Sequence, residues 1–463
     1  DWTLSADDGA TWWAVAPPAE LRTGDQLQVE ITREGQESPC VAQLAVIAPE
    51  LLAKPVAEAA RVVHRGEVTE QVRFAVTVPE TSGLARTDEV ATAGLPFPRG
   101  CLTEEANVRV LDDGGQPVPC QFRPVGRWSD GSARTTVVAF PANVGADALA
   151  RYTIEAGKNV TPGPEGALQL SEEADRICID TGPLQAVFSK RKGTVVETLG
   201  RGAEVVKPAE AAWELVVGTE EGRTLRSGGE TVSSVRIVER GPVRALLVRT
   251  GSLADEAGKQ LDYRMTTELT AGSDLLRVEV SIVNREDQPE VYIKRWSLDF
   301  PVAGAETGRV DLGDRWCAAN DGAVLYQHRE DRLTWTGADA ECSRVEGKAS
   351  GWVRLPGLVI GPRWFWQRFP QAVQFSPDKV RFDLLPEAFD SGDLPTRWRD
   401  RLLEMTDRFT VGGVGYPQSP GKMGLFRLTR GEALSQEFGI VADGAAVDAP
   451  PVGRERLVTP LRP

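Results

Sequence analysis

The alternation of short apolar runs with turn-forming residues over residues 94–140 is the feature that most restricts the fold of this chain. Apolar runs at residues 108–111 and 136–140 are separated by the turn formers of residues 112–115 and 129–132. This punctuation is typical of antiparallel strands joined by tight turns, and it excludes a helical periodicity. The segment therefore predicts an all-β domain.

Strand signals continue through residues 163–440, with Gly or charged turns between them. Many strands without intervening helices predict a large antiparallel β-sandwich. The pattern predicts a small N-terminal partial β-sandwich module at residues 1–55, a strand-rich domain at residues 56–162 and a tail or linker at residues 441–463. We also expect a short helix or linker at residues 51–63 and a helix at residues 395–406.

Three segments of the barrel region, and more downstream, carry a resemblance to a known family. They read LPFPRG from Leu95, NVRVLDDGGQPVPCQF from Asn107 and RWSDGSARTTVVAF from Arg127. Together with residues 241–251, 263–284 and 365–375, this wording resembles the YetA-like proteins, a family that includes exo-acting rhamnogalacturonan lyases.

That resemblance implies an architecture and an activity. Members of the family have an N-terminal RIFT-type β-barrel, a central β-sandwich and a C-terminal α/α toroid that carries much of the catalytic cleft. The resemblance implies that residues 56–162 of this chain form the RIFT-type β-barrel and residues 163–440 the central β-sandwich. This chain has no run of helical repeats, so we expect the toroid to be absent from it. The resemblance implies the β-domain portion of a polysaccharide lyase-like protein that acts on uronate-containing glycan by β-elimination. The alternative is a non-catalytic glycan-binding or scaffolding module.

The same resemblance implies a polysaccharide partner, and a C-terminal helical domain of the parent protein as a further partner. It implies a secreted, periplasmic or cell-surface location. Such chemistry requires no cofactor, although a structural calcium ion is compatible with it.

Charge excludes some partners. The chain has 67 Asp and Glu against 53 Lys and Arg, a net charge of −14, and no block of basic residues, which argues against nucleic acid. No apolar run approaches the roughly 20 residues of a membrane helix, so we expect no membrane insertion. An acidic glycan would have to meet a local cluster of Arg and Lys.

Six cysteines are scattered along the chain without a C-x-x-C pair, which argues against a zinc ribbon or a thioredoxin motif. An even number permits disulfides, although isolated buried thiols are the commoner case in a large domain. The candidate pairs are Cys317 with Cys342 and Cys101 with Cys120, since each pair falls within one predicted domain.

Two residues of the segment VLYQHREDRLTW are the candidates for proton transfer. Tyr326 and His328 are of the types that carry protons in β-elimination beside a uronate carboxylate. The alternative is a strand edge whose residues face solvent.

Aromatic and cationic residues suggest where a glycan would bind. If residues 361–375 are a strand, Trp364 and Trp366 share one face and Arg363 lies on the other. Aromatic faces stack on pyranose rings and Arg binds carboxylates, so these three residues, with Arg295 and Trp296, are candidate substrate-binding residues. The alternative is that the Trp rings fill the sandwich core.

Overall fold

The computed structural model describes residues 2–5, 11–14, 71–103, 107–202, 204–208, 210–285, 287–337, 346–387, 410–411, 414–415, 426–442 and 461. The chain divides into two compact units, Asp1–Glu67 and Val68–Pro463. In the first unit, β1 (Trp2–Ser5) and β2 (Thr11–Ala14) form an antiparallel pair. The helices expected at residues 51–63 and 395–406 lie outside the described residues.

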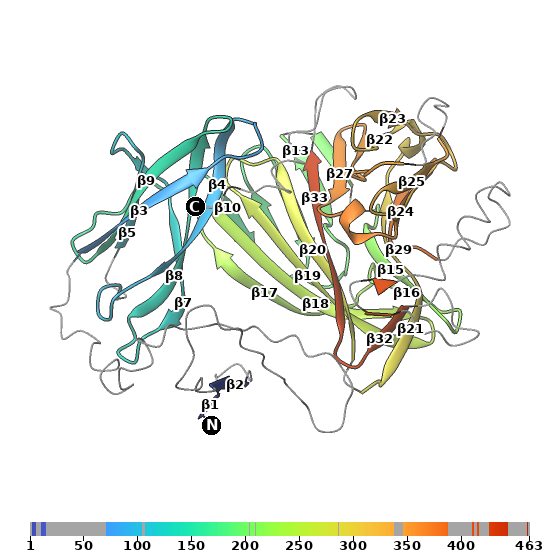
Figure 1. Cartoon of the computed structure of the whole chain (residues 1–463), viewed down its shortest axis with the longest axis horizontal. Helices are drawn as coiled ribbons and strands as arrows, with labels where there is room; N and C mark the ends of the chain where they lie inside the picture. Colours follow the sequence, from blue (N-terminus) through green and yellow to red (C-terminus); the bar gives the residue numbers. More distant parts are fainter. Residues whose placement is uncertain are drawn as a thin grey trace, which may run out of the picture. The chain divides into compact units, whose positions relative to one another are not determined.

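Strands dominate the described part of the chain, and the all-β prediction is confirmed (Figure 1). The helical elements described there are two single turns of 3₁₀ helix, η1 (Ala305–Thr307) and η3 (Trp366–Arg368). No helix among the described residues has the length and apolar character needed to cross a membrane.

The smaller β-domain, residues 71–157, consists of a four-stranded sheet in the order β3-β9-β5-β6 and a three-stranded sheet in the order β4-β8-β7. Its apolar residues alternate along the strands because every second side chain points inward, and Val78, Val110, Phe140 and Ile154 are fully buried. The strands are β3 (Gln71–Pro79), β4 (Arg86–Pro96), β5 (Asn107–Leu111), β6 (Pro117–Val118), β7 (Gln121–Arg127), β8 (Ala133–Val144) and β9 (Leu149–Gly157).

Leu461, which lies in the segment that was predicted as a tail, contributes to this domain. Leu461 is buried in the core of the smaller β-domain, and its backbone N–H donates to Glu89 Oε1 over 3.4 Å. At the other end of the predicted tail, the last strand of the larger domain continues to Ala442.

The larger β-domain, residues 169–442, begins with a five-stranded antiparallel sheet, β10 to β14. These strands are β10 (Gln169–Glu172), β11 (Arg176–Asp180), β12 (Gln185–Ser189), β13 (Thr198–Arg201) and β14 (Glu204–Lys207). They share one hydrophobic core with the seventeen-stranded sheet that follows.

That seventeen-stranded sheet folds into two layers. Layer one pairs in the order β17-β18-β19-β20-β33-β27-β26-β22-β23, and layer two in the order β16-β15-β21-β29-β28-β24-β25, with β32 beside β21. Figure 1 shows β17 to β20 side by side and β33 next to β20. Residues far apart in the sequence thus share a layer.

The layers have the following strands. Layer one contains β17 (Val232–Arg240), β18 (Arg244–Asp255), β19 (Gly258–Thr270), β20 (Leu275–Asn284), β22 (Arg309–Asp311), β23 (Trp316–Ala318), β26 (Val353–Leu355), β27 (Leu358–Pro362) and β33 (Ala433–Ala442). Layer two contains β15 (Glu214–Thr219), β16 (Thr224–Arg226), β21 (Glu290–Pro301), β24 (Val324–Arg329), β25 (Arg332–Trp335), β28 (Gln371–Ser376), β29 (Lys379–Leu385) and β32 (Phe426–Thr429). A short pair, β30 (Thr410–Val411) and β31 (Val414–Gly415), lies outside both layers.

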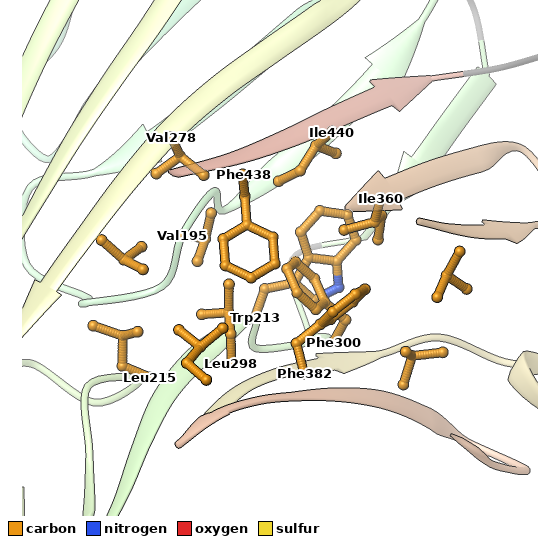
Figure 2. Close-up of a cluster of buried hydrophobic side chains, with 14 of the residues drawn as sticks. Val195, Trp213, Leu215, Val278, Leu298, Phe300, Ile360, Phe382, Phe438 and Ile440 are labelled. Atoms are coloured by element: carbon orange, nitrogen blue, oxygen red, sulfur yellow. The ribbon is translucent and has the colours of Figure 1, made fainter. Parts of the chain in front are cut away.

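Aromatic rings fill the space between the layers (Figure 2). Phe300 of layer two contacts Phe382 edge-on, with ring centroids 5.6 Å apart, and Phe382 contacts Phe438 of layer one in the same way at 5.3 Å. Trp213 packs against Phe300 with centroids 5.1 Å apart. Aliphatic side chains of both layers surround these rings, among them Val278, Leu298, Ile360 and Ile440.

Gln121 joins the two β-domains. Its Oε1 accepts the backbone N–H groups of Val243 (3.3 Å) and Arg244 (2.8 Å), and its Nε2 donates to Glu239 over 3.2 Å. A Cβ at Gly241 would lie 2.0 Å from Gln121 Oε1, so glycine leaves room for this contact.

Replacing Gln121 with Leu should therefore lower the free energy of unfolding by about 1 to 3 kcal/mol, because two buried N–H groups lose their acceptor. Chemical denaturation measures the change. The matched variant Gln185→Leu, at an exposed glutamine of β12, should change stability by less than about 0.5 kcal/mol. Equal losses in the two variants would show that the Gln121 contacts contribute nothing.

The cysteine predictions have different outcomes. Cys101, Cys120 and Cys178 are free thiols, so the predicted Cys101–Cys120 disulfide is wrong. Cys101 lies in the core of the smaller domain, and the Cys120 thiol donates instead to the Val108 carbonyl over 3.5 Å. Cys317 is disulfide-bonded. Cys342 lies outside the described residues, so the pairing with Cys342 stays a prediction.

Candidate functional site

Tyr326 and His328, the candidates for proton transfer, lie on β24 and are both buried, with 8% of each residue exposed. Their ring centroids are 4.2 Å apart, and His328 Nε2 is 2.8 Å from Thr334 Oγ1 on the neighbouring strand β25. Burial lowers the pKa of His328 to about 4. The imidazole is therefore neutral at pH 7, so it can accept a proton but has none to donate as an imidazolium.

The outward face of layer two carries a polar cluster that the sequence interpretation missed. Asp299 accepts two hydrogen bonds from Arg381, from Nε at 2.7 Å and from Nη2 at 2.9 Å. Asp383, two residues further along β29, accepts a hydrogen bond from Gln374 Nε2 over 2.6 Å. We call Asp299, Gln374, Arg381 and Asp383 the layer-two polar cluster.

Asp383 has the most perturbed carboxyl group of this cluster. Burial raises its pKa to about 7, the charge of Asp299 adds to the rise, and the Arg381 and Arg295 guanidinium groups oppose it. Strand pairing connects it to the predicted residues, because Tyr326 pairs with Ala372 and Ala372 pairs with Asp383. Arg295 and Tyr326 thus belong to the surroundings of one buried carboxyl group.

Trp296 does not belong to a binding surface. It is 3% exposed and is a member of the core between the layers. The reason is the alternation along β21, which turns Trp296, Leu298 and Phe300 inward while Asp299 faces outward. Its ring is a packing element, and we do not retain Trp296 in the candidate site.

The segment after β27 is not the strand that the alternation predicted. β27 ends at Pro362, Arg363 N–H still donates to Glu437 O over 2.9 Å, and the chain then turns into η3. Phe365 is buried against Gly351, where a Cβ would lie 2.4 Å from the ring. The prediction of two alternating faces is therefore wrong, because burial of Phe365 turns the chain away from β33.

Trp364 and Trp366 are both half-buried, and each has a cation over its ring. Arg363 Cζ lies 4.8 Å from the centroid of the Trp364 ring, and Lys348 Nζ lies 4.4 Å from that of Trp366. Arg363 Nη1 also donates to Glu437 Oε2 over 2.7 Å. These contacts hold two cations at defined positions, and we call them the cation–Trp pairs.

A pocket with a volume of about 500 Å³ adjoins the second pair, since Lys348 is in its lining. It lies between the β22–β23 turn and the β24–β25 turn. Its lining comprises Leu312, Gly313, Asp314, Asp331, Glu346, Gly347 and Lys348. The lining comes from three separate segments, so no local sequence signal could have predicted it.

The predicted site residues thus form two groups. Tyr326, His328 and Arg295 lie in layer two near Asp383, whereas Arg363, Trp364 and Trp366 follow the end of β27 in layer one. Across the described part of the chain, no group of three or more His, Cys, Asp or Glu side chains is arranged to hold a metal ion.

Comparison with known proteins identifies the smaller β-domain. Residues 81–157 match a family model described as the PcRGLX-like N-terminal RIFT barrel domain. The smaller domain is therefore a RIFT barrel similar to the N-terminal domain of PcRGLX-like proteins. No curated protein sequence matches the chain.

Solved structures show only distant similarity. A glycosyl hydrolase family 38 protein from Enterococcus faecalis has a TM-score of 0.48 and 14% identity over 83% of this chain and 46% of its own. An alpha-mannosidase from E. faecalis V583 has a TM-score of 0.45 and 13% identity over 80% of this chain and 43% of its own. A galactose mutarotase-like protein from Lactobacillus casei has a TM-score of 0.31 and 11% identity over 59% of this chain and 99% of its own. This chain thus spans less than half the length of the first two.

Proposed function

We propose that this chain is the β-domain portion of a polysaccharide lyase-like protein that acts on a uronate-containing, rhamnogalacturonan-type glycan by β-elimination. The observation that carries the proposal is the match of residues 81–157 to the RIFT barrel of rhamnogalacturonan lyase-like proteins. The YetA-like wording of the segments beyond the barrel supports it further.

In this proposal, Arg363 and Lys348 of the cation–Trp pairs are the cations that meet the acidic glycan, and Arg363 exchanges its contact with Glu437 for a uronate carboxylate. Arg363 and the exposed Arg368 lie in the segment that follows β27, and Lys348 reaches this segment from another loop by its contact with Trp366. A guanidinium group binds a carboxylate at two points, and a cation held over an indole loses less side-chain freedom when it binds. In this proposal, the cation–Trp pairs bind the uronate carboxylates.

β-Elimination requires a base for the proton next to the carboxylate, a cation for the developing enolate and an acid for the leaving oxygen. Tyr326, His328 and Arg295 are the residues of the required types in layer two. Incubation with rhamnogalacturonan and other polyuronates, followed by the absorbance of the unsaturated product, tests the activity. Absence of product from the full-length parent protein as well would refute it.

Burial favours a second candidate function, a non-catalytic glycan-binding or scaffolding module. Tyr326 and His328 are each only 8% exposed, so a glycan chain has little access to their side chains in this conformation. Binding without elimination products would support this alternative. A secreted, periplasmic or cell-surface location fits both functions and is supported by the disulfide at Cys317.

Replacing Arg363 with Ala should weaken binding to a polyuronate about tenfold, because the loss of one charge-assisted contact with a carboxylate costs about 1.5 kcal/mol. Isothermal titration calorimetry with rhamnogalacturonan oligosaccharides measures the affinity. The matched variant Arg151→Ala, at an exposed arginine of β9, should bind like the wild type. Unchanged affinity in the Arg363 variant would place the acidic glycan elsewhere.

A further inference from the structure

The pocket beside Lys348 has a fixed shape. Gln327 is fully buried and its Nε2 donates to the carbonyls of Arg329 (2.6 Å) and Gly347 (3.0 Å). Its Oε1 accepts the Ala349 N–H over 2.9 Å. One amide thus binds the backbone on both sides of Lys348, and it ties that loop to the β24–β25 turn.

Gly313 fixes the opposite wall. It has a φ of +101°, and a Cβ there would lie 2.1 Å from the Lys348 carbonyl oxygen. Only glycine fits this backbone conformation and this close approach. The β22–β23 turn and the β24–β25 turn are therefore both held against the backbone at Lys348, so the pocket is formed before any ligand binds.

The side chains that line this pocket carry a net negative charge. Asp314, Asp331 and Glu346 present three carboxylates, against the one ammonium group of Lys348, and all four residues are exposed. Carboxylates accept charge-assisted hydrogen bonds from hydroxyl groups, whereas a further carboxylate among them is repelled. The lining therefore suits a ligand with many hydroxyl groups and no negative charge.

We propose that this pocket binds a neutral sugar residue of the glycan, next to a uronate residue bound at the cation–Trp pairs. Its volume of about 500 Å³ exceeds that of a single pyranose ring, and Lys348 contacts Trp366 while also lining the pocket. The inference rests on the proposed function for the identity of the glycan. It goes further by assigning neutral and acidic residues to neighbouring positions.

The test compares the full chain with the double variant Asp331→Asn, Glu346→Gln, which keeps the shape of the pocket and removes two negative charges. Three oligosaccharides of equal length serve as probes: alternating rhamnogalacturonan, neutral galactan and all-uronate homogalacturonan. We expect the double variant to bind galactan at least about tenfold more weakly than the wild type, because two charge-assisted acceptors for hydroxyl groups are lost. Homogalacturonan, which binds through the cation–Trp pairs, should lose no affinity in the double variant. Glu330→Gln, at an exposed residue outside the lining, should bind both probes like the wild type.

The outcomes separate this inference from the proposed function. Unchanged galactan affinity in the double variant, or an equal loss of affinity for galactan and homogalacturonan, overturns the neutral subsite. Absence of galactan binding also overturns it, whether or not rhamnogalacturonan binds through Arg363. Galactan binding that depends on Asp331 and Glu346 supports the subsite even if no uronate glycan is bound, and in that case only the proposed function fails.

Discussion

Replacing Trp213 with Ala lowers the free energy of unfolding by about 3 to 5 kcal/mol, the range for removing a large aromatic side chain from a packed core. Trp213 is fully buried, contacts Phe300 edge-on and donates from Nε1 to the Pro301 carbonyl over 3.2 Å (Figure 2). The variant also deprives the Lys207 ammonium group of the ring 5.7 Å away, while Lys207 itself stays buried. Chemical denaturation at neutral pH measures the loss.

Two further variants make this result specific. Trp213→Phe keeps most of the buried ring and should lose less stability than Trp213→Ala. Leu149→Ala removes an apolar side chain that is 67% exposed and should change stability by less than about 0.5 kcal/mol. Equal losses for Trp213→Ala and Leu149→Ala would contradict the core described above.

Replacing Asp383 with Asn should make the larger domain more stable at pH 8 but not at pH 4. Burial raises the pKa of this carboxyl from 3.8 to about 7 in the folded state. Between these values the folded state binds a proton that the unfolded state has released. The favourable contribution of the neutral carboxyl is therefore complete below about pH 4 and lost as the pH rises through about 7.

Asn carries no titrating group, so the difference in unfolding free energy between the Asn variant and the wild type should grow with pH. The expected increase from pH 4 to pH 8 is on the order of 4 kcal/mol. Denaturant titrations of both proteins at several pH values measure it. A difference that stays constant over this range would show that Asp383 ionises normally, and NMR titration of its carboxyl would then confirm that directly.

The fold class could be predicted because alternating apolar positions and turn residues are local signals. QVRFAVTVP is β3 over its whole length, and LLRVEVSIVN is β20. The pairing of β20 with β33 could not be predicted, because it joins Leu275 to Val441 and depends on which apolar faces pack best across the whole domain. Leu461 was placed in a tail for the same reason, since its contact with Glu89 joins residues that lie far apart in the sequence.

Residue type alone was a weaker guide to the site. Arg363, Trp364 and Trp366 were selected for their chemistry and lie together, yet their arrangement depends on the burial of Phe365, which alternation could not show. Asp383 was missed because its surroundings come from β21, β24 and β28 through strand pairing. Trp296 was misassigned on residue type alone, although its alternation with Leu298 and Phe300 indicates the inward face of β21.

The free thiols of the RIFT barrel affect how this chain would mature in an oxidising compartment. Burial raises the pKa of the Cys101 thiol and of the Cys120 thiol. Only the thiolate attacks a disulfide, so these two thiols of the folded barrel are poor partners for exchange with the bond at Cys317. Folding of the barrel thus withdraws two of the three described free thiols from scrambling reactions.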